Sequence, residues 1–201
     1  MKLYFSPASP YVRKVVVCAI EAGLDKRIER LTTDIYDPKS PVHGKNPLGR
    51  LPTLIADDTA VLFDSPVICE YLDSLHQGHK LFPPGGPARF AALVRQALGD
   101  GILDAAVQIR QEKMRPAAQQ SPETVARRLR NIRLTLDELE GRAPELISAG
   151  VDIGTIAIAC ALGYLDFRFA EEKWRDGRGK LAGWYASFSL RPSMVETKPV
   201  G

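Results

Sequence analysis

A segment rich in proline and glycine divides this chain of 201 residues into two halves of different character. The segment is QGHKLFPPGGPA, residues 77–88, and it holds three Pro and three Gly without hydrophobic periodicity. Such a composition is typical of a connection between two domains. Strand patterns occur before this segment, whereas the patterns after it are helical. We therefore predict a first domain over residues 1–77, a linker over 78–87 and a second domain over 88–201.

The first half alternates between strand and helix patterns. Short apolar or β-branched runs predict strands in residues 2–5, from residue 28, and in residues 51–55 and 60–63. Apolar side chains at helical spacing predict helices in residues 11–22 and 64–76. We expect Ser65 to cap the second of these helices, with Pro66 in its first turn. The predicted order is β-α-β-loop-β-β-α, and the last two strands form a hairpin.

The second half is predicted to be all helical. Amphipathic patterns run through residues 88–115 and 123–142, and another helix opens with IGTIAIACAL at residue 153. The stretch from Ile153 to Leu165 contains no charged side chain. Such a stretch predicts a helix packed on nearly every side, at the centre of the second domain.

Composition and charge narrow the class of protein. The net charge is only +3 and both signs are interspersed, so we expect no nucleic-acid partner. No apolar run approaches the ~20 residues that span a bilayer, so we expect no membrane association. The three cysteines lie among apolar neighbours without a Cys-x-x-Cys pair, which indicates a reduced, cytoplasmic protein. His76 and His79 have no partner at metal-ligand spacing, and we predict no metal.

Ser9, in SPASPYVRKVVV, stands before a proline at the start of the first predicted helix. A serine there can cap the helix by accepting from a backbone N–H, and taken alone the segment favours this role. A hydroxyl at the positive end of a helix can also donate to an anion such as a thiolate, which lowers the pKa of that thiol. No histidine lies beside Ser9 in the sequence, so a serine nucleophile is not predicted.

Two further motifs could hold a ligand. In RLPTL, a cis Leu51–Pro52 peptide would leave the N–H and C=O of Leu51 free to pair with an extended peptide, although an isolated Leu-Pro favours a trans bond. In DSP, Asp64 offers an anion to an ammonium group, and Ser65 with its neighbouring N–H groups suits a carboxylate. An amino acid presents both of these groups together.

Taken in this order, the motifs resemble those of the cytosolic glutathione transferases. The likeness is carried by SPYVRKV, NPLGRLPTL, DSPVICEYL, the helical second half with IGTIAIACALGYLDFRF, and RPS, and it spans essentially the whole chain. The chain is most similar to bacterial members with a serine in the active site. The resemblance implies an α/β thioredoxin-like N-terminal domain, an all-α C-terminal domain and a homodimer.

The resemblance also implies roles for single residues, with glutathione as co-substrate. Ser9 would donate a hydrogen bond to the glutathione sulfur. Leu51 precedes the family's cis-proline, here Pro52, and its backbone would pair with the cysteinyl part of the tripeptide.

The two ends of glutathione would bind elsewhere in the first half. Asp64 and Ser65 would hold the γ-glutamyl group, and Asp64 is shorter than the Glu that many relatives have there. Lys39 and His43 lie where the glycyl carboxylate is often bound.

The central helix of the second half also departs from the family pattern. Many relatives begin this helix with Ser or Thr and place Asp three residues later, whereas here Asp152 comes first and Thr155 second. Asp is a good N-cap, so we expect the helix to start normally but to lose the return bond that an acid at the third position makes.

The implied reaction is conjugation of glutathione to a small hydrophobic electrophile, as in detoxification. The acceptor pocket would draw on Tyr11, Ile102, Val107 and Arg110. Two alternatives remain open. One is a glutathione-dependent thiol reductase or isomerase of the same fold, which normally uses a cysteine where this chain has Ser9. The other is a non-catalytic glutathione-binding or interaction module.

Overall fold

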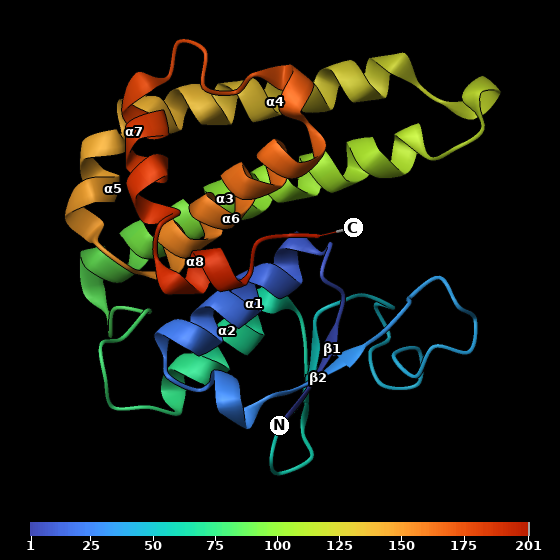
Figure 1. The fold of residues 1–201 in the computed structure, drawn as a ribbon, viewed down its shortest axis with the longest axis vertical. Helices are drawn as coiled ribbons and strands as arrows, with labels where there is room; N and C mark the ends of the chain where they lie inside the picture. Colours follow the sequence, from blue (N-terminus) through green and yellow to red (C-terminus); the bar gives the residue numbers. More distant parts are fainter. Residues whose placement is uncertain (201) are drawn as a thin grey trace. The chain divides into compact units, whose positions relative to one another are not determined.

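The computed structural model describes residues 1–200, and the chain forms two compact units (Figure 1). Unit 1 holds Met1–Arg89 together with residues 192–200, and unit 2 holds Phe90–Arg191. The predicted second domain comprised all of residues 88–201, whereas the structure groups the segment that begins at Pro192 with unit 1, because its helix packs on the first helix of unit 1.

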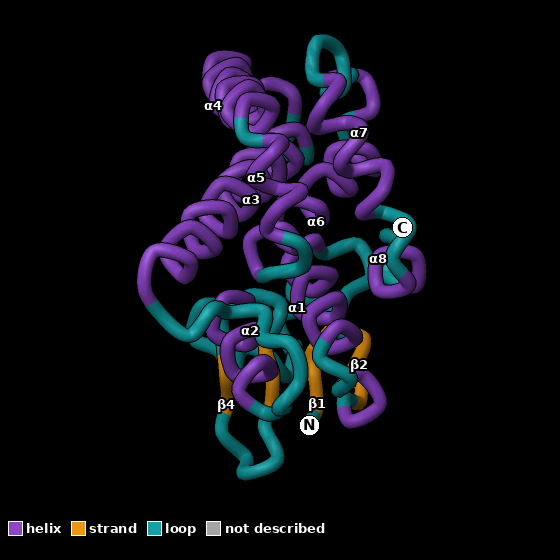
Figure 2. Tube along the Cα trace, turned by 90° about the vertical axis from the view of Figure 1, so that its left-hand side faces the viewer, coloured by secondary structure: helices purple, strands orange, loops and turns teal. Residues whose placement is uncertain are grey.

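Unit 1 combines one mixed sheet with helices, as the thioredoxin-like prediction requires. Within residues 1–200, the sheet has the strand order β2-β1-β3-β4, and β1 pairs with β2 in parallel and with β3 antiparallel. Figure 2 colours these strands orange. The strands are β1 (Lys2–Phe5), β2 (Glu29–Thr32), β3 (Thr53–Ile55) and β4 (Val61–Leu62), and the helices are α1 (Pro10–Glu21), the 3₁₀ turn η1 (Asp25–Arg27), α2 (Ser65–Ser74) and α8 (Pro192–Glu196). The predicted element order is confirmed.

The helix α8 is fastened to α1 by polar contacts. Arg13 donates to the carbonyl of Met194 at 3.0 Å and to the hydroxyl of Thr197 at 3.3 Å. Ser193 donates to the carboxylate of Glu21 at the other end of α1. Because Arg13 and Glu21 lie two helical turns apart, they hold α8 at two points along α1.

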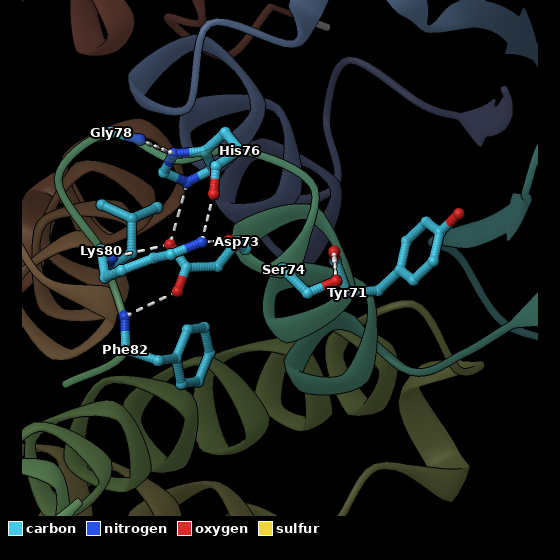
Figure 3. Close-up of polar contacts among 8 residues, drawn as sticks. Tyr71, Asp73, Ser74, His76, Gly78, Lys80 and Phe82 are labelled. Atoms are coloured by element: carbon cyan, nitrogen blue, oxygen red, sulfur yellow. Dashed lines mark hydrogen bonds and ion pairs between the residues drawn. The ribbon is translucent and has the colours of Figure 1, made fainter. Parts of the chain in front are cut away.

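The connection that leaves α2 is anchored by a buried carboxylate (Figure 3). Asp73 is 5% exposed and accepts hydrogen bonds from the backbone N–H of Leu81 at 2.7 Å and of Phe82 at 3.2 Å. It also pairs with Nε2 of His76 at 3.1 Å, and Nδ1 of His76 accepts from the N–H of Gly78 at 3.1 Å. The start of the predicted linker is therefore bound to the last turn of α2.

Unit 2 is helical throughout the part that the structure describes. Its elements are α3 (Gly86–Lys113, which begins in unit 1), η2 (Ala117–Gln119), α4 (Pro122–Gly141), α5 (Ala143–Ala149), α6 (Ile153–Arg168), η3 (Ala170–Glu172) and α7 (Gly179–Phe188). Every residue of α6 from Ile153 to Leu165 is buried, which confirms the predicted central helix. None of the helices in residues 1–200 is long and apolar enough to cross a membrane.

The start of α6 corrects one expectation. The side chain of Asp152 accepts from the N–H of Thr155 at 2.8 Å, as an N-cap should. The return bond is present as well, because the hydroxyl of Thr155 accepts from the N–H of Asp152 at 2.9 Å. A hydroxyl can therefore replace the acid of the usual capping box, and the reversed order loses no bond.

Candidate functional site

Strand register brings the sequence motifs of unit 1 to one end of the sheet. Strand β1 runs toward Phe5, and its antiparallel partner β3 starts beside it, with Tyr4 opposite Thr53. Strand β4 runs antiparallel to β3, with Leu54 opposite Leu62, and therefore finishes at the same end of the sheet as β1. The segments that follow β1, precede β3 and follow β4 therefore converge.

Ser9 occupies the N-cap position of α1. Its backbone is extended, and its side-chain oxygen accepts from the N–H of Val12 at 3.4 Å. Pro10 follows at the first helical position. The hydroxyl hydrogen of Ser9 has no acceptor among the described residues, and the side chain is partly exposed. A hydroxyl has one donor and two acceptor sites, so capping leaves the donor available.

The Leu51–Pro52 peptide is cis, and no backbone group of the described residues pairs with the N–H or C=O of Leu51. The loop before it is held by two buried polar residues that the sequence analysis did not single out. Asn46 donates to the carbonyl of Arg50 at 3.1 Å and to the hydroxyl of Thr53 at 2.9 Å. This network fixes the loop while Leu51 keeps its backbone groups unpaired. The turn residues in NPLG were the available signal.

The start of α2 differs from the predicted one in a single position. Asp64, not Ser65, is the N-cap residue, and its side chain makes no capping bond. Ser65 is instead the first helical residue and is buried, whereas Asp64 is exposed. Because no side chain caps this helix, the N–H groups of Ser65 and Val67 are available to an anion. The Phe63–Asp64 peptide is cis.

Lys39 and His43 lie in the loop that follows β2, which ends at the same edge of the sheet because it is parallel to β1. Both side chains are exposed. The N–H of Lys39 donates to the carboxylate of Asp37 at 2.8 Å, and Nε2 of His43 lies 3.2 Å from the carbonyl oxygen of Asp37. The ammonium of Lys39 pairs with no carboxylate in residues 1–200.

The residues predicted for the acceptor pocket differ in accessibility. Tyr11, which follows Ser9 and Pro10 at the start of α1, is partly exposed, as are Val107 and Arg110 in α3. Ile102 is fully buried, so its side chain is not on an open surface. Ile102 is therefore the weakest member of that predicted set.

The three cysteines are buried, and they form no disulfide. Cys18, in α1, is 0% exposed, as are Cys69 and Cys160. A thiol in that position cannot form a mixed disulfide with a substrate from solvent. Within residues 1–200, no cluster of three or more His, Cys, Asp or Glu side chains could hold a metal ion.

Comparison with known proteins gives consistent matches over the chain. Residues 8–75 match the family model for the glutathione S-transferase N-terminal domain, and residues 122–187 match that for the C-terminal domain. The uncharacterised GST-like protein YibF of Escherichia coli (strain K12) is 35% identical over 201 residues, which cover 99% of this chain and 98% of that protein.

Two solved structures are similar over essentially the full length. A glutathione transferase family member from Pseudomonas fluorescens Pf-5 with bound glutathione is 41% identical, with a TM-score of 0.95 over 100% of this chain and 99% of that one. A glutathione S-transferase from Methylobacillus flagellatus KT with GSH bound is 35% identical, with a TM-score of 0.93 over 99% of each chain.

Proposed function

The chain belongs to the glutathione transferase family, and on that basis we propose that it binds glutathione in unit 1 and conjugates it to a hydrophobic electrophile. In this proposal Ser9 stabilises the glutathione thiolate. The observation that carries it is the hydroxyl of Ser9, which caps α1 through its oxygen and keeps its hydrogen for a ligand.

The remaining parts of glutathione find chemically suitable groups at the same end of the sheet. The ammonium of the γ-glutamyl group meets the exposed carboxylate of Asp64, and its carboxylate meets the uncapped N–H groups and hydroxyl at Ser65. The cysteinyl backbone pairs with the N–H and C=O of Leu51 as an added strand. Lys39 and His43 attract the glycyl carboxylate.

The reaction follows from stabilisation of the thiolate. The hydrogen bond from Ser9 and the positive end of α1 both favour the charged sulfur, and its proton passes to solvent. The thiolate then attacks an electrophilic carbon; a sulfur–carbon bond forms, and the leaving group departs with its bonding pair. A free thiol has a pKa of about 8.5. Lowering this pKa by about two units represents about 2.7 kcal/mol and raises the thiolate fraction at neutral pH about 25-fold.

The test is the variant Ser9→Ala. We expect the pKa of bound glutathione, followed by thiolate absorbance, to rise by about two units, and conjugation of an aryl halide at neutral pH to slow about 25-fold. The variant also removes a helix cap, so Ser121→Ala is the matched control: Ser121 caps α4 by accepting from the N–H of Thr124 at 3.2 Å. An unchanged titration and rate in Ser9→Ala would remove Ser9 from the mechanism.

Retention on immobilised glutathione separates binding from catalysis. A chain that is retained but turns over none of a panel of electrophiles is a binding module, and the conjugation proposal then fails while glutathione binding stands. We further propose a homodimer that acts in the cytoplasm in detoxification. Three buried cysteines without a disulfide support a reducing compartment, and sedimentation tests the dimer.

A further inference from the structure

Unit 2 contains a cleft of about 130 Å³ that none of the predicted glutathione residues lines. Three segments form its walls: the inner face of α4, the end of α6, and the loop from η3 toward α7. Its apolar surface comes from Leu129, Ile132, Leu136, Leu165, Phe169 and Trp174. All of these residues belong to unit 2.

The size of the cleft suits one aromatic ring. An engineered protein cavity of about 150 Å³, lined by Leu, Ile and Phe, binds benzene. The present cleft has a similar volume, and the apolar part of its lining is similar in kind. A ligand with two fused rings would exceed it, whereas a small aliphatic molecule would leave part of the wall without contacts.

The aromatic wall is held in one position. The indole N–H of Trp174 donates to Asp166 at 2.7 Å, and the guanidinium of Arg175 lies 4.3 Å from the centre of the Trp174 ring. Arg175 is itself held by two hydrogen bonds to Asp166, at 2.6 and 2.8 Å. Tyr185 packs edge-on against Trp174 at 5.8 Å. A wall fixed in this way loses little conformational entropy when a ligand binds.

Positive and negative side chains around the cleft are equal in number. Arg133 pairs with Glu172 at 2.7 Å, and Arg178 pairs with Asp137 at 2.6 Å. The other two charged residues of the lining are Lys173 and Asp176, which carry opposite charges. The lining therefore holds three cations and two carboxylates, and a third carboxylate, that of Asp137 outside the lining, neutralises Arg178. A charged ligand would find no net opposite charge there. A hydroxyl group, in contrast, can both donate and accept there.

We propose that this cleft binds a neutral, single-ring aromatic molecule of the phenol class. The ring lies against the apolar wall that includes Trp174, and the hydroxyl lies among the paired charges at the edge. No residue of this lining belongs to the proposed glutathione site, so we expect Ser9→Ala to bind phenol as the wild type does.

The indole N–H of Trp174 is the reporter for the test. The chain has two tryptophans, and Trp184→Phe assigns their N–H signals in a nitrogen-15 NMR spectrum. Titration with phenol should shift the Trp174 signal and saturate, whereas benzoate and benzylammonium should bind at least tenfold more weakly. A shift that never saturates overturns the site, and equally tight binding of benzoate or benzylammonium overturns the preference for a neutral ligand.

A filling variant locates the ligand. Leu129→Trp should weaken phenol binding at least tenfold by occupying the cleft. The control is Leu134→Trp on the same helix, because Leu134 is 62% exposed and does not line the cleft; it should bind phenol unchanged. Should Leu129→Trp fail to fold, a wild-type crystal soaked in 4-bromophenol provides the second measurement. A bromine anomalous peak beside Trp174 supports the proposal, and its absence overturns it.

Discussion

Asp73 offers a sharp test of how unit 1 holds the connection to α3. In Asp73→Ala, the buried N–H groups of Leu81 and Phe82 lose their acceptor, and His76 loses its partner (Figure 3). Each buried donor left unsatisfied costs about 1–3 kcal/mol. Part of this loss is offset, because the variant no longer carries the desolvation penalty of a buried carboxylate. We therefore expect a net loss of about 3 kcal/mol in the free energy of unfolding.

The control is Glu70→Ala, one turn earlier in α2. Glu70 pairs with Arg89, but its side chain is 56% exposed, so its loss should cost about 0–1 kcal/mol. Urea unfolding gives both values. Amide hydrogen exchange localises the effect: the N–H groups of Leu81 and Phe82 should exchange about 100-fold faster in Asp73→Ala. Asp73 does not hold the connection if the unfolding free energies of the two variants differ by less than about 0.5 kcal/mol, or if the Leu81 amide stays protected in Asp73→Ala.

Three further predictions concern stability. The N-terminal ammonium and then Arg27 lower the pKa of Asp57 from its ordinary value of 3.8, so its contribution to stability is present above that value and is lost as the pH falls through the lowered pKa. The gap in urea midpoint between wild type and Asp57→Asn should therefore stay constant from about pH 7 to about pH 5 and narrow below about pH 4. Thr155→Val removes a buried hydroxyl from the capping box and should cost about 1–2 kcal/mol in urea unfolding. Gly154→Ala puts a Cβ 2.6 Å from a backbone oxygen of α3 and should lower the free energy of unfolding by about 3 kcal/mol. In Gly101→Ala the new Cβ meets nothing within 4 Å, so this control should gain about 0.5–1 kcal/mol and melt at a higher temperature.

Much of the fold was accessible from the sequence because its signals are local. Hydrophobic periodicity and the turn residues predicted every strand of the described sheet and the long helices α3, α4 and α6. The docking of α8 was not accessible. It depends on Arg13 and Glu21, whose bonds to α8 span more than 170 residues of sequence, and no local pattern marks such contacts.

The features of the candidate site likewise fall into those that have a local sequence signal and those that have none. The cap at Ser9 follows from residues adjacent in the chain. The cis bond before Pro52 does not, because local sequence favours a trans bond and only the family resemblance implied the cis form that the structure has. The exchange of roles between Asp64 and Ser65 was missed because both residues are good caps, and only the backbone geometry decides between them. Asn46 was missed because its function, to hold the Leu51 loop, appears only when its partner Thr53 is seen beside it.

The site therefore depends on strand register as well as on its own side chains. Thr53 lies opposite Tyr4 on β1 and is fully buried, with its hydroxyl bonded to Asn46 and to the carbonyl of Arg50. A slip of β3 by one residue would turn Thr53 to the other face of the sheet and break both bonds. It would also move Leu51 by about 3.3 Å relative to the end of β1, which exceeds the tolerance of a hydrogen bond. The β1–β3 ladder thus sets the distance between Ser9 and Leu51, and the buried pair of Asn46 and Thr53 holds the Leu51 loop against the start of β3.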